Sequence, residues 1–146
     1  MYRIPAVRIA LVRERTIASS LRVIRSPEDA ALILREVIGD RDRETFTVLL
    51  LDTKNRVVAV HVASIGSLDS APVHPREIFK AAILANVKAV ILGHNHPSGD
   101  PEPSQNDIHV TRKLAEAGKL LGVPVLDHII VGDGVHVSLR ARGIIT

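Results

Sequence analysis

The amino-acid sequence predicts a single α/β domain over residues 1–146, with a central mixed β-sheet and flanking helices in a three-layer-like arrangement. A chain of 146 residues is one domain's worth and buries roughly 70% of its unfolded surface. Apolar runs at residues 46–52, 89–92 and 125–131 show little alternation, as expected of strands that are covered on both faces. Helix signals fall between these runs, and the chain contains no internal repeat, low-complexity stretch or linker.

The first half of the chain predicts an edge strand, a helix and a β-hairpin. Residues 8–13 alternate enough to form a first strand at a sheet edge. A helix is expected from a serine N-cap to a glycine, with proline at its first position and acids in its first turn: Ser26, Pro27, Glu28, Asp29 and Gly39. The β-rich residues 46–52 predict a central strand, followed by a turn at residues 53–55 and a second strand at residues 56–65.

The second half of the chain predicts alternating helices and strands. In order, the expected elements are a loop at residues 66–73, a helix from His74 through Asn86, a buried strand at residues 89–92, a helix from Ser104 to about Leu121, and strands at residues 125–131 and 136–139. Gly122 and Pro124 stop the last helix, and Asp133-Gly134 forms a tight turn between the final two strands.

The composition excludes several classes of protein. Hydrophobic residues make up 46% and charged residues 24% of the chain, an ordinary globular composition. Without cysteine, the chain has no disulfide, thiolate metal ligand or cysteine nucleophile. The sequence shows no signal-peptide layout and no apolar run near ~18 residues, so the expectation is a cytoplasmic protein that does not contact a membrane.

The positive charge is concentrated at the start of the chain. Residues 1–25 hold six arginines against the single acid Glu14: Arg3, Arg8, Arg13, Arg15, Arg22 and Arg25. Such a run is more often a solvated edge strand and connector than a binding surface. A phosphate-binding patch for nucleic acid is the alternative, and neither it nor an oligomeric state can be decided from the sequence.

A metal site is expected where the strand at residues 89–92 ends. If His94 and His96 continue the extended backbone, their side chains point to one face. A carboxylate from the next helix, Asp107, would complete a three-ligand set with an open fourth position, the arrangement of catalytic zinc. Ser104 and Asp107 also have the spacing of a capping box, which implies no chemistry, but the two interpretations are compatible.

These residues match a known motif. His94-Asn95-His96-Pro97 followed by Ser104 and Asp107 has the spacing of the JAMM motif of JAB/MPN metallopeptidases, H-x-H-P-x6-S-x2-D. Residues 46–55, 73–81, 94–100 and 126–132 further resemble the RadC family of bacterial JAB-domain proteins, and the resemblance covers about residues 8–143. Many RadC-like proteins carry an N-terminal helix-hairpin-helix region for which this chain has no room, so the expectation is the short form.

The resemblance implies a hydrolase that holds Zn²⁺ through His94, His96 and Asp107 and cleaves a peptide or isopeptide bond in an unidentified protein or peptide substrate. It also implies that Ser104 polarises the carbonyl or stabilises the oxyanion. The remaining catalytic residue of the family is an upstream glutamate, and Glu44 is the matching position. Glu44 would take the proton of the metal-activated water and deliver it to the leaving amine.

Two assignments have rivals. Glu77 is the alternative to Glu44, although it lies in an expected helix first turn, where acids are favoured by the helix dipole. Asp127-His128 interrupts a buried run and either supports the metal site or is a satisfied polar pair in the core. The remaining histidines are expected to be structural or exposed: His61, His74, His109 and His136.

Three other functions compete with a zinc hydrolase. A zinc nucleobase deaminase shares a broadly similar α/β layout, but its P-C-x-x-C ligands are excluded in a chain without cysteine. A nucleic-acid-associated, DNA-repair-linked metal-binding protein without peptidase activity fits the pI of ≈ 9.7 and the historical label of the RadC family. An aromatic content of 2% opposes base stacking, however. A metal-binding scaffold without catalysis is disfavoured by the intact motif.

Overall fold

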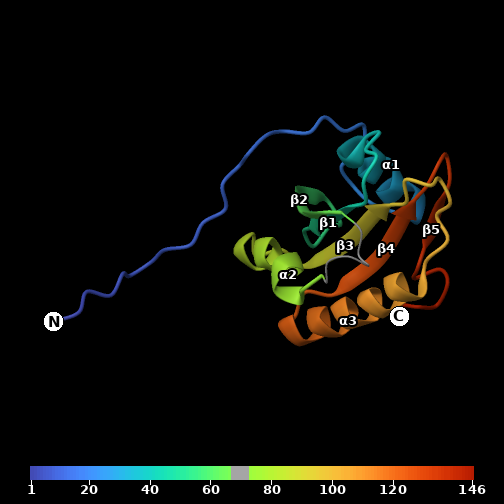
Figure 1. Ribbon diagram of the computed structural model, residues 1–146. Coiled ribbons are helices and arrows are strands. Elements are labelled where there is room, and N and C mark those ends of the chain that lie inside the picture. Colours follow the sequence, from blue (N-terminus) through green and yellow to red (C-terminus); the bar gives the residue numbers. More distant parts are fainter. Residues whose placement is uncertain (67–72) are drawn as a thin grey trace.

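One mixed β-sheet organises the computed structural model, which describes residues 1–66 and 73–146 (Figure 1). Within these residues the sheet has the strand order β2-β1-β3-β4-β5. The strands are β1 (Thr45–Leu51), β2 (Val57–Ile65), β3 (Ala89–Asn95), β4 (Val125–Val131) and β5 (His136–Ser138). β3 and β4 are parallel, and the other neighbouring pairs are antiparallel. This arrangement confirms the predicted central mixed sheet.

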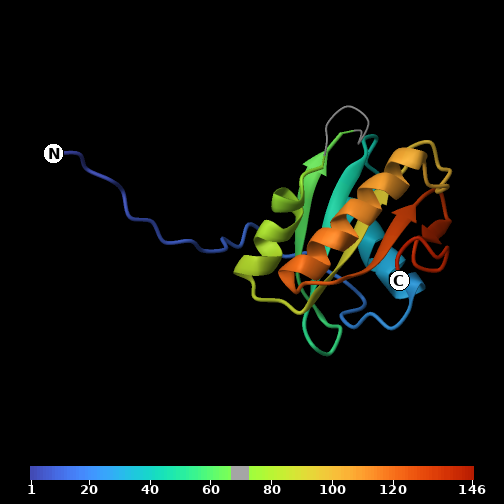
Figure 2. The ribbon, with the colours of Figure 1, turned by 90° about the horizontal axis from the view of Figure 1, so that it is seen from below.

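Helices cover both faces of the sheet. Helix α1 (Pro27–Ile38) packs on one face, whereas α2 (Pro75–Leu84) and α3 (Gln105–Leu121) pack on the other, as Figure 2 shows. Every residue of β1 and β3 is buried, which explains why their sequences do not alternate. Consecutive residues nevertheless serve different cores, because Leu49 packs toward α1 and Leu50 toward α2 and α3. None of the helices in the described ranges is long and apolar enough to cross a membrane.

The predicted element boundaries are confirmed where capping residues mark them. Ser26 Oγ accepts a hydrogen bond from Asp29 N at the start of α1, and Gly39, with a φ of 65°, ends that helix. The hairpin turn places Asn55 in the left-handed region at φ 58°. Helix α2 ends at Leu84, before the predicted Asn86, because Asn86 itself adopts a φ of 56° that a helix cannot continue. Residues 67–72 of the predicted loop lie outside the described residues.

The predicted strand at residues 8–13 is wrong. Residues 1–19 have no regular secondary structure, and the N-terminal part of this segment extends away from the domain (Figure 1). The chain that precedes α1 contacts the sheet through an isolated β-bridge between Val23 and Arg56. Before this bridge, the side chains of Ile17 and Leu21 pack against the α1 core. This packing leads the chain away from the sheet, so it does not run along β2. The alternation of residues 8–13 therefore predicted a strand, but these residues pair with no strand in the described part of the chain.

Candidate metal centre

Strand β3 and helix α3 bring three potential ligands together. His94 lies in β3, His96 follows the strand by one residue, and Asp107 lies in the first turn of α3. One ligand atom from each of these side chains lies within 4.8 Å of the others. His94 and Asp107 are buried, and His96 is partly buried. The expectation that both imidazoles face the same side and meet a carboxylate from the next helix is confirmed.

The separations suit a tetrahedral ion. His94 Nε2 lies 3.1 Å from His96 Nε2 and 3.3 Å from Asp107 Oδ1, and His96 Nε2 lies 3.1 Å from Asp107 Oδ2. Ligand bonds of about 2.0–2.1 Å to a tetrahedral ion place neighbouring ligand atoms about 3.3 Å apart. The three side chains therefore could hold a metal ion with little movement.

The turn after β3 holds His96 in place and sets its tautomer. His96 N donates to Val131 O at 2.9 Å, and Gly99 N donates to His96 O at 2.9 Å. The His96 Nδ1 atom lies 2.9 Å from Asp100 O, and since a carbonyl only accepts, Nδ1 carries the proton. His96 Nε2 then presents a lone pair to the ligand group. Gly132 is required here because a Cβ on it would lie 2.3 Å from Gly99 O.

A buried chain of hydrogen bonds sets the tautomer of His94 in the same way. Thr111 Oγ1 donates to Asp107 O at 2.6 Å and therefore accepts from His128 Nδ1, also at 2.6 Å. Since Nδ1 carries the proton of His128, its Nε2 accepts from His94 Nδ1 at 2.7 Å. The Nε2 atom of His94 is left without a proton and faces Asp107. We call the three hydrogen-bonded side chains His94, His128 and Thr111 the histidine relay.

The electrostatics of the group favour a cation. Two imidazole lone pairs and a carboxylate converge, which is unfavourable unless a positive charge lies between them. The hydrogen bond to Asp107 raises the pKa of His96, so this imidazole takes up a proton more readily than a free histidine does. Burial opposes ionisation of Asp107, but its interactions with the imidazoles of His94 and His96 outweigh burial and lower the pKa of its carboxyl. Burial and the nearby His94 lower the pKa of His128 well below 6.5, so His128 is neutral.

Ser104 is both a helix cap and a neighbour of the metal group. Its Oγ accepts from Asp107 N at 3.0 Å, and its own backbone N donates to Asp107 Oδ2 at 2.8 Å. This capping box holds the Asp107 carboxylate in position beside the histidines. The Ser104 hydroxyl proton is not used in the cap, so it can be donated to a bound molecule.

Glu44 lies beside the group, and Glu77 does not. The antiparallel pairing of β1 and β3 ends with Phe46 opposite His94, so Glu44 and His96 come next at the same end of the two strands. The Glu44 charge helps to raise the pKa of His96. Glu77 instead lies on α2 at 3.3 Å from Lys80 Nζ, and its charge acts on His61. The geometry therefore favours Glu44 over its rival.

Asn95 is a positioning residue that the sequence did not indicate. Its buried side chain accepts from Thr45 N at 2.7 Å and donates to Arg43 O at 3.0 Å. These two bonds hold the backbone on both sides of Glu44, and Gly66 N adds a third bond to Glu44 O at 2.7 Å. Strand alternation indicates only that the residue between the two histidines faces the opposite side, and it does not reveal the contact of Asn95 with residues 43–45.

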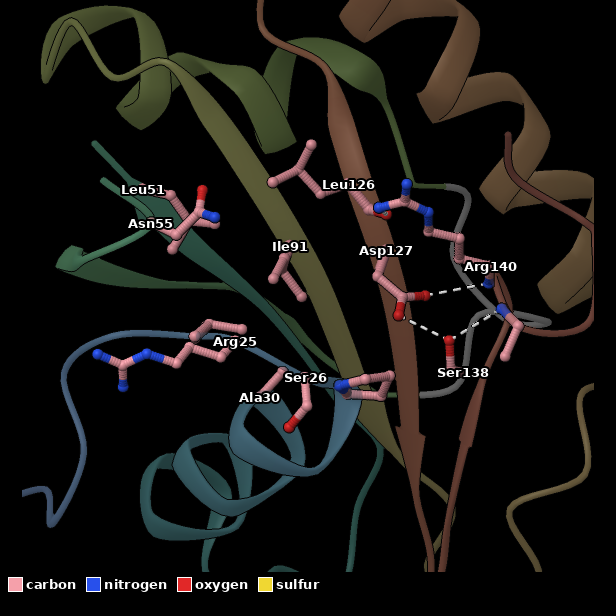
Figure 3. Close-up of a pocket in the computed structure, with 13 residues that line it drawn as sticks. Arg25, Ser26, Ala30, Leu51, Asn55, Ile91, Leu126, Asp127, Ser138 and Arg140 are labelled. Atoms are coloured by element: carbon pink, nitrogen blue, oxygen red, sulfur yellow. Dashed lines mark hydrogen bonds between the residues drawn. The ribbon is translucent and has the colours of Figure 1, made fainter. Parts of the chain in front are cut away.

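Asp127 and His128 turn out to serve opposite faces of the sheet. His128 belongs to the histidine relay, whereas Asp127 faces α1 and a pocket of about 480 Å³, which Figure 3 shows. Asp127 accepts hydrogen bonds from Ser138 Oγ at 2.6 Å, Arg140 N at 3.1 Å and His128 N at 2.7 Å. Asp127 is therefore a buried acid whose carboxylate is fully engaged in hydrogen bonds, and it lies apart from the metal group. The remaining histidines also lie outside the metal group: His61, His74, His109 and His136.

Comparison with known proteins agrees with this geometry. The family model of the RadC-like JAB domain matches residues 24–144. The chain is 53% identical over 123 residues to a UPF0758 protein of Desulforamulus reducens, which covers 84% of this chain and 54% of the relative. It is 51% identical over 124 residues to a UPF0758 protein of Methanosarcina mazei, which covers 85% of this chain and 54% of that relative.

The match reaches both ends of the folded domain, from Ile24 before α1 to Ile144 after β5. The chain spans about half the length of the curated relatives that it matches. Because the family model covers far more than half of the sequence, the chain belongs to the family of RadC-like JAB domains.

Proposed function

We propose that this protein is a zinc-dependent hydrolase that cleaves amide bonds, in a peptide or isopeptide linkage, with a water molecule activated at the His94, His96 and Asp107 group. The observation that carries the proposal is the convergence of two imidazole nitrogens and a carboxylate at separations of 3.1–3.3 Å. Membership of the JAB-domain family supports it.

The donor set argues for zinc and for catalysis. Two histidines and one carboxylate are a common catalytic zinc set, and three protein ligands leave one position for water or substrate. Zinc held there would lower the pKa of a water molecule to about 7 and polarise a substrate carbonyl. The partial exposure of His96 leaves the group open to solvent on one side.

Two residues of the chain supply the remaining chemistry in this proposal. Asn95 holds the backbone on both sides of Glu44 through its hydrogen bonds with Thr45 N and Arg43 O. The Glu44 carboxylate accepts a proton from the attacking water and delivers it to the leaving amine. The Ser104 hydroxyl donates a hydrogen bond to the carbonyl oxygen as negative charge develops there. Its oxygen is fixed by the cap bond from Asp107 N, so the donor is oriented before substrate arrives.

The test compares Glu44→Gln with Glu77→Gln, a matched change of the rival glutamate. Both variants and the wild type are loaded with zinc and assayed on a panel of peptides and isopeptide-linked peptides, with zinc content measured in the same samples. We expect Glu44→Gln to lose at least about 100-fold in turnover, in the range of a general base, while it retains zinc. Glu77→Gln should keep wild-type turnover.

Equal turnover of Glu44→Gln and the wild type would contradict the role of Glu44. Absence of turnover by the zinc-loaded wild type across the panel, together with binding to DNA that weakens steeply with salt, would instead support a nucleic-acid-associated protein.

A further inference from the structure

The first residues of the chain expose many apolar side chains. We call residues 2–13 the arm. It carries six large apolar side chains that are 49–95% exposed: Tyr2, Ile4, Val7, Ile9, Leu11 and Val12. The arm has no regular secondary structure and projects from the domain in both views (Figures 1 and 2). Single exposed apolar residues are common, but a continuous series of them marks a surface that binds a partner.

The arm has the sequence of a strand. In extended backbone Val7, Ile9 and Leu11 lie on one side, whereas Arg8 lies on the other. Flexible tails contain few β-branched residues, because they have no apolar surface to bury. A nucleic-acid-binding arm requires the arginines but has no use for an apolar face. The arm therefore fits addition to a β-sheet better than binding to phosphates.

The sheet formed by the described residues has one long edge strand. β2 is nine residues long and lies at the edge of the sheet, whereas the opposite edge is the three-residue β5. The bonds from the chain's own first segment, Val57 N to Arg22 O and Ile24 N to Asn55 O, reach only the start of β2. Large apolar side chains at this edge and on the adjacent α2 are 45–55% exposed: Val58, Ile65 and Ile83.

The segment between the arm and α1 turns away from this edge, so the arm does not pair with β2 of its own domain. Had the bridge between Val23 and Arg56 continued, the preceding residues would have paired along β2. Instead Leu21 packs on the α1 core, and Ser20 Oγ bonds to Glu36 Oε1 at 3.0 Å. The arm, about 40 Å long when extended, leaves the domain and can reach a neighbouring molecule.

We propose that the arm adds as an antiparallel strand to the β2 edge of a second copy of this chain, and that the two copies exchange arms reciprocally. Each copy then contributes about 20 residues, its arm and its β2 strand, which is the size of a stable protein interface. The exchange covers the apolar face of the arm and closes the open edge. This interface is independent of the metal group.

The test measures the mass of the whole chain in solution by light scattering at several concentrations. The wild type should have twice the chain mass of 15.8 kDa. The double variant Ile9→Pro/Ala10→Pro should have the single-chain mass, because neighbouring N–H groups of a strand point to opposite sides and one of them must face β2. Both positions are exposed, so the domain itself should fold unchanged.

Two further measurements identify the surface. Arg8→Ala/Arg13→Ala, which removes charge and keeps the strand, should remain a dimer. Amide exchange along residues 58–64 should be slower in the wild type than in the double-proline variant, because the added strand protects that edge. A wild type of 15.8 kDa would overturn the proposal, and so would a dimer that survives the prolines or leaves β2 exchange unchanged.

Discussion

Replacing His128 tests whether the histidine relay prepares His94 to bind the proposed zinc ion. In the histidine relay, His128 Nε2 accepts the proton of His94 Nδ1 at 2.7 Å, and this bond keeps His94 Nε2 free for a metal. His128→Leu removes the acceptor with little change of volume. In the metal-free variant, His94 can move its proton to Nε2 and donate to Asp107 Oδ1, 3.3 Å away. Metal binding would forbid that tautomer and leave a buried Nδ1–H without an acceptor.

The substitution His128→Leu therefore destabilises the metal-bound state more than the metal-free state. An unsatisfied buried donor costs about 1–3 kcal/mol, and His94 is only 1% exposed. Since about 1.4 kcal/mol corresponds to a tenfold change in affinity, this free-energy cost should lower the zinc affinity about 5- to 150-fold. This range agrees with the effect of removing the partner of a metal-bound histidine in other sites, about 10- to 100-fold.

The assay is a competition titration of zinc against a chromophoric chelator, with thermal unfolding of each metal-free variant to check its fold. His128→Gln, whose side-chain oxygen can accept from His94 Nδ1, should recover part of the affinity. His61→Leu, at a half-buried histidine of β2 outside the group, is the matched control and should bind zinc as the wild type does. If His128→Leu binds zinc within twofold of the wild type, the histidine relay does not position His94.

Three other predictions follow from single contacts. Zinc affinity should fall about tenfold per pH unit once the pH drops below the pKa of His96, since zinc must displace its proton; that pKa is raised by Asp107, so the fall should begin above pH 6.5 in a pH-resolved titration. Asn95→Ala should lower turnover about 10- to 100-fold with little loss of zinc, because the backbone around Glu44 loses its hydrogen bonds to Asn95; equal losses of both would contradict this. Thr47→Val should raise the free energy of unfolding in urea by about 1 kcal/mol, since Thr47 Oγ1 is buried without a partner among the described residues.

The sequence predicted the parts of the fold that local chemistry controls. Caps and turns were placed well because Ser26, Gly39 and Ser104 satisfy backbone groups that only such residues can satisfy. The metal group was predictable because all three of its members lie within 14 residues of one another, on a strand, a turn and a helix start.

The rest depends on contacts between distant segments. Nothing near Asn95 in the sequence reveals that its side chain holds residues 43–45, because that contact joins two strands. The separation of Asp127 from His128 arises from strand alternation, which sends neighbours to opposite faces. The arm has the alternating pattern of a strand, but it does not pair with β2 of its own domain, because the packing of Leu21 on the α1 core leads the chain away from that edge.

The most direct test of the proposed metal centre is the zinc content of protein purified without an immobilised-metal step. The variants are His96→Ala and Asp107→Asn, the second chosen because asparagine can still accept the cap bond from Ser104 N. His109→Ala, at an exposed histidine of α3, is the control. The wild type and the control should hold close to one zinc ion per chain, and the two ligand variants should hold little. A wild type that takes up no zinc, or ligand variants that hold as much as the wild type, would contradict the assignment of this site.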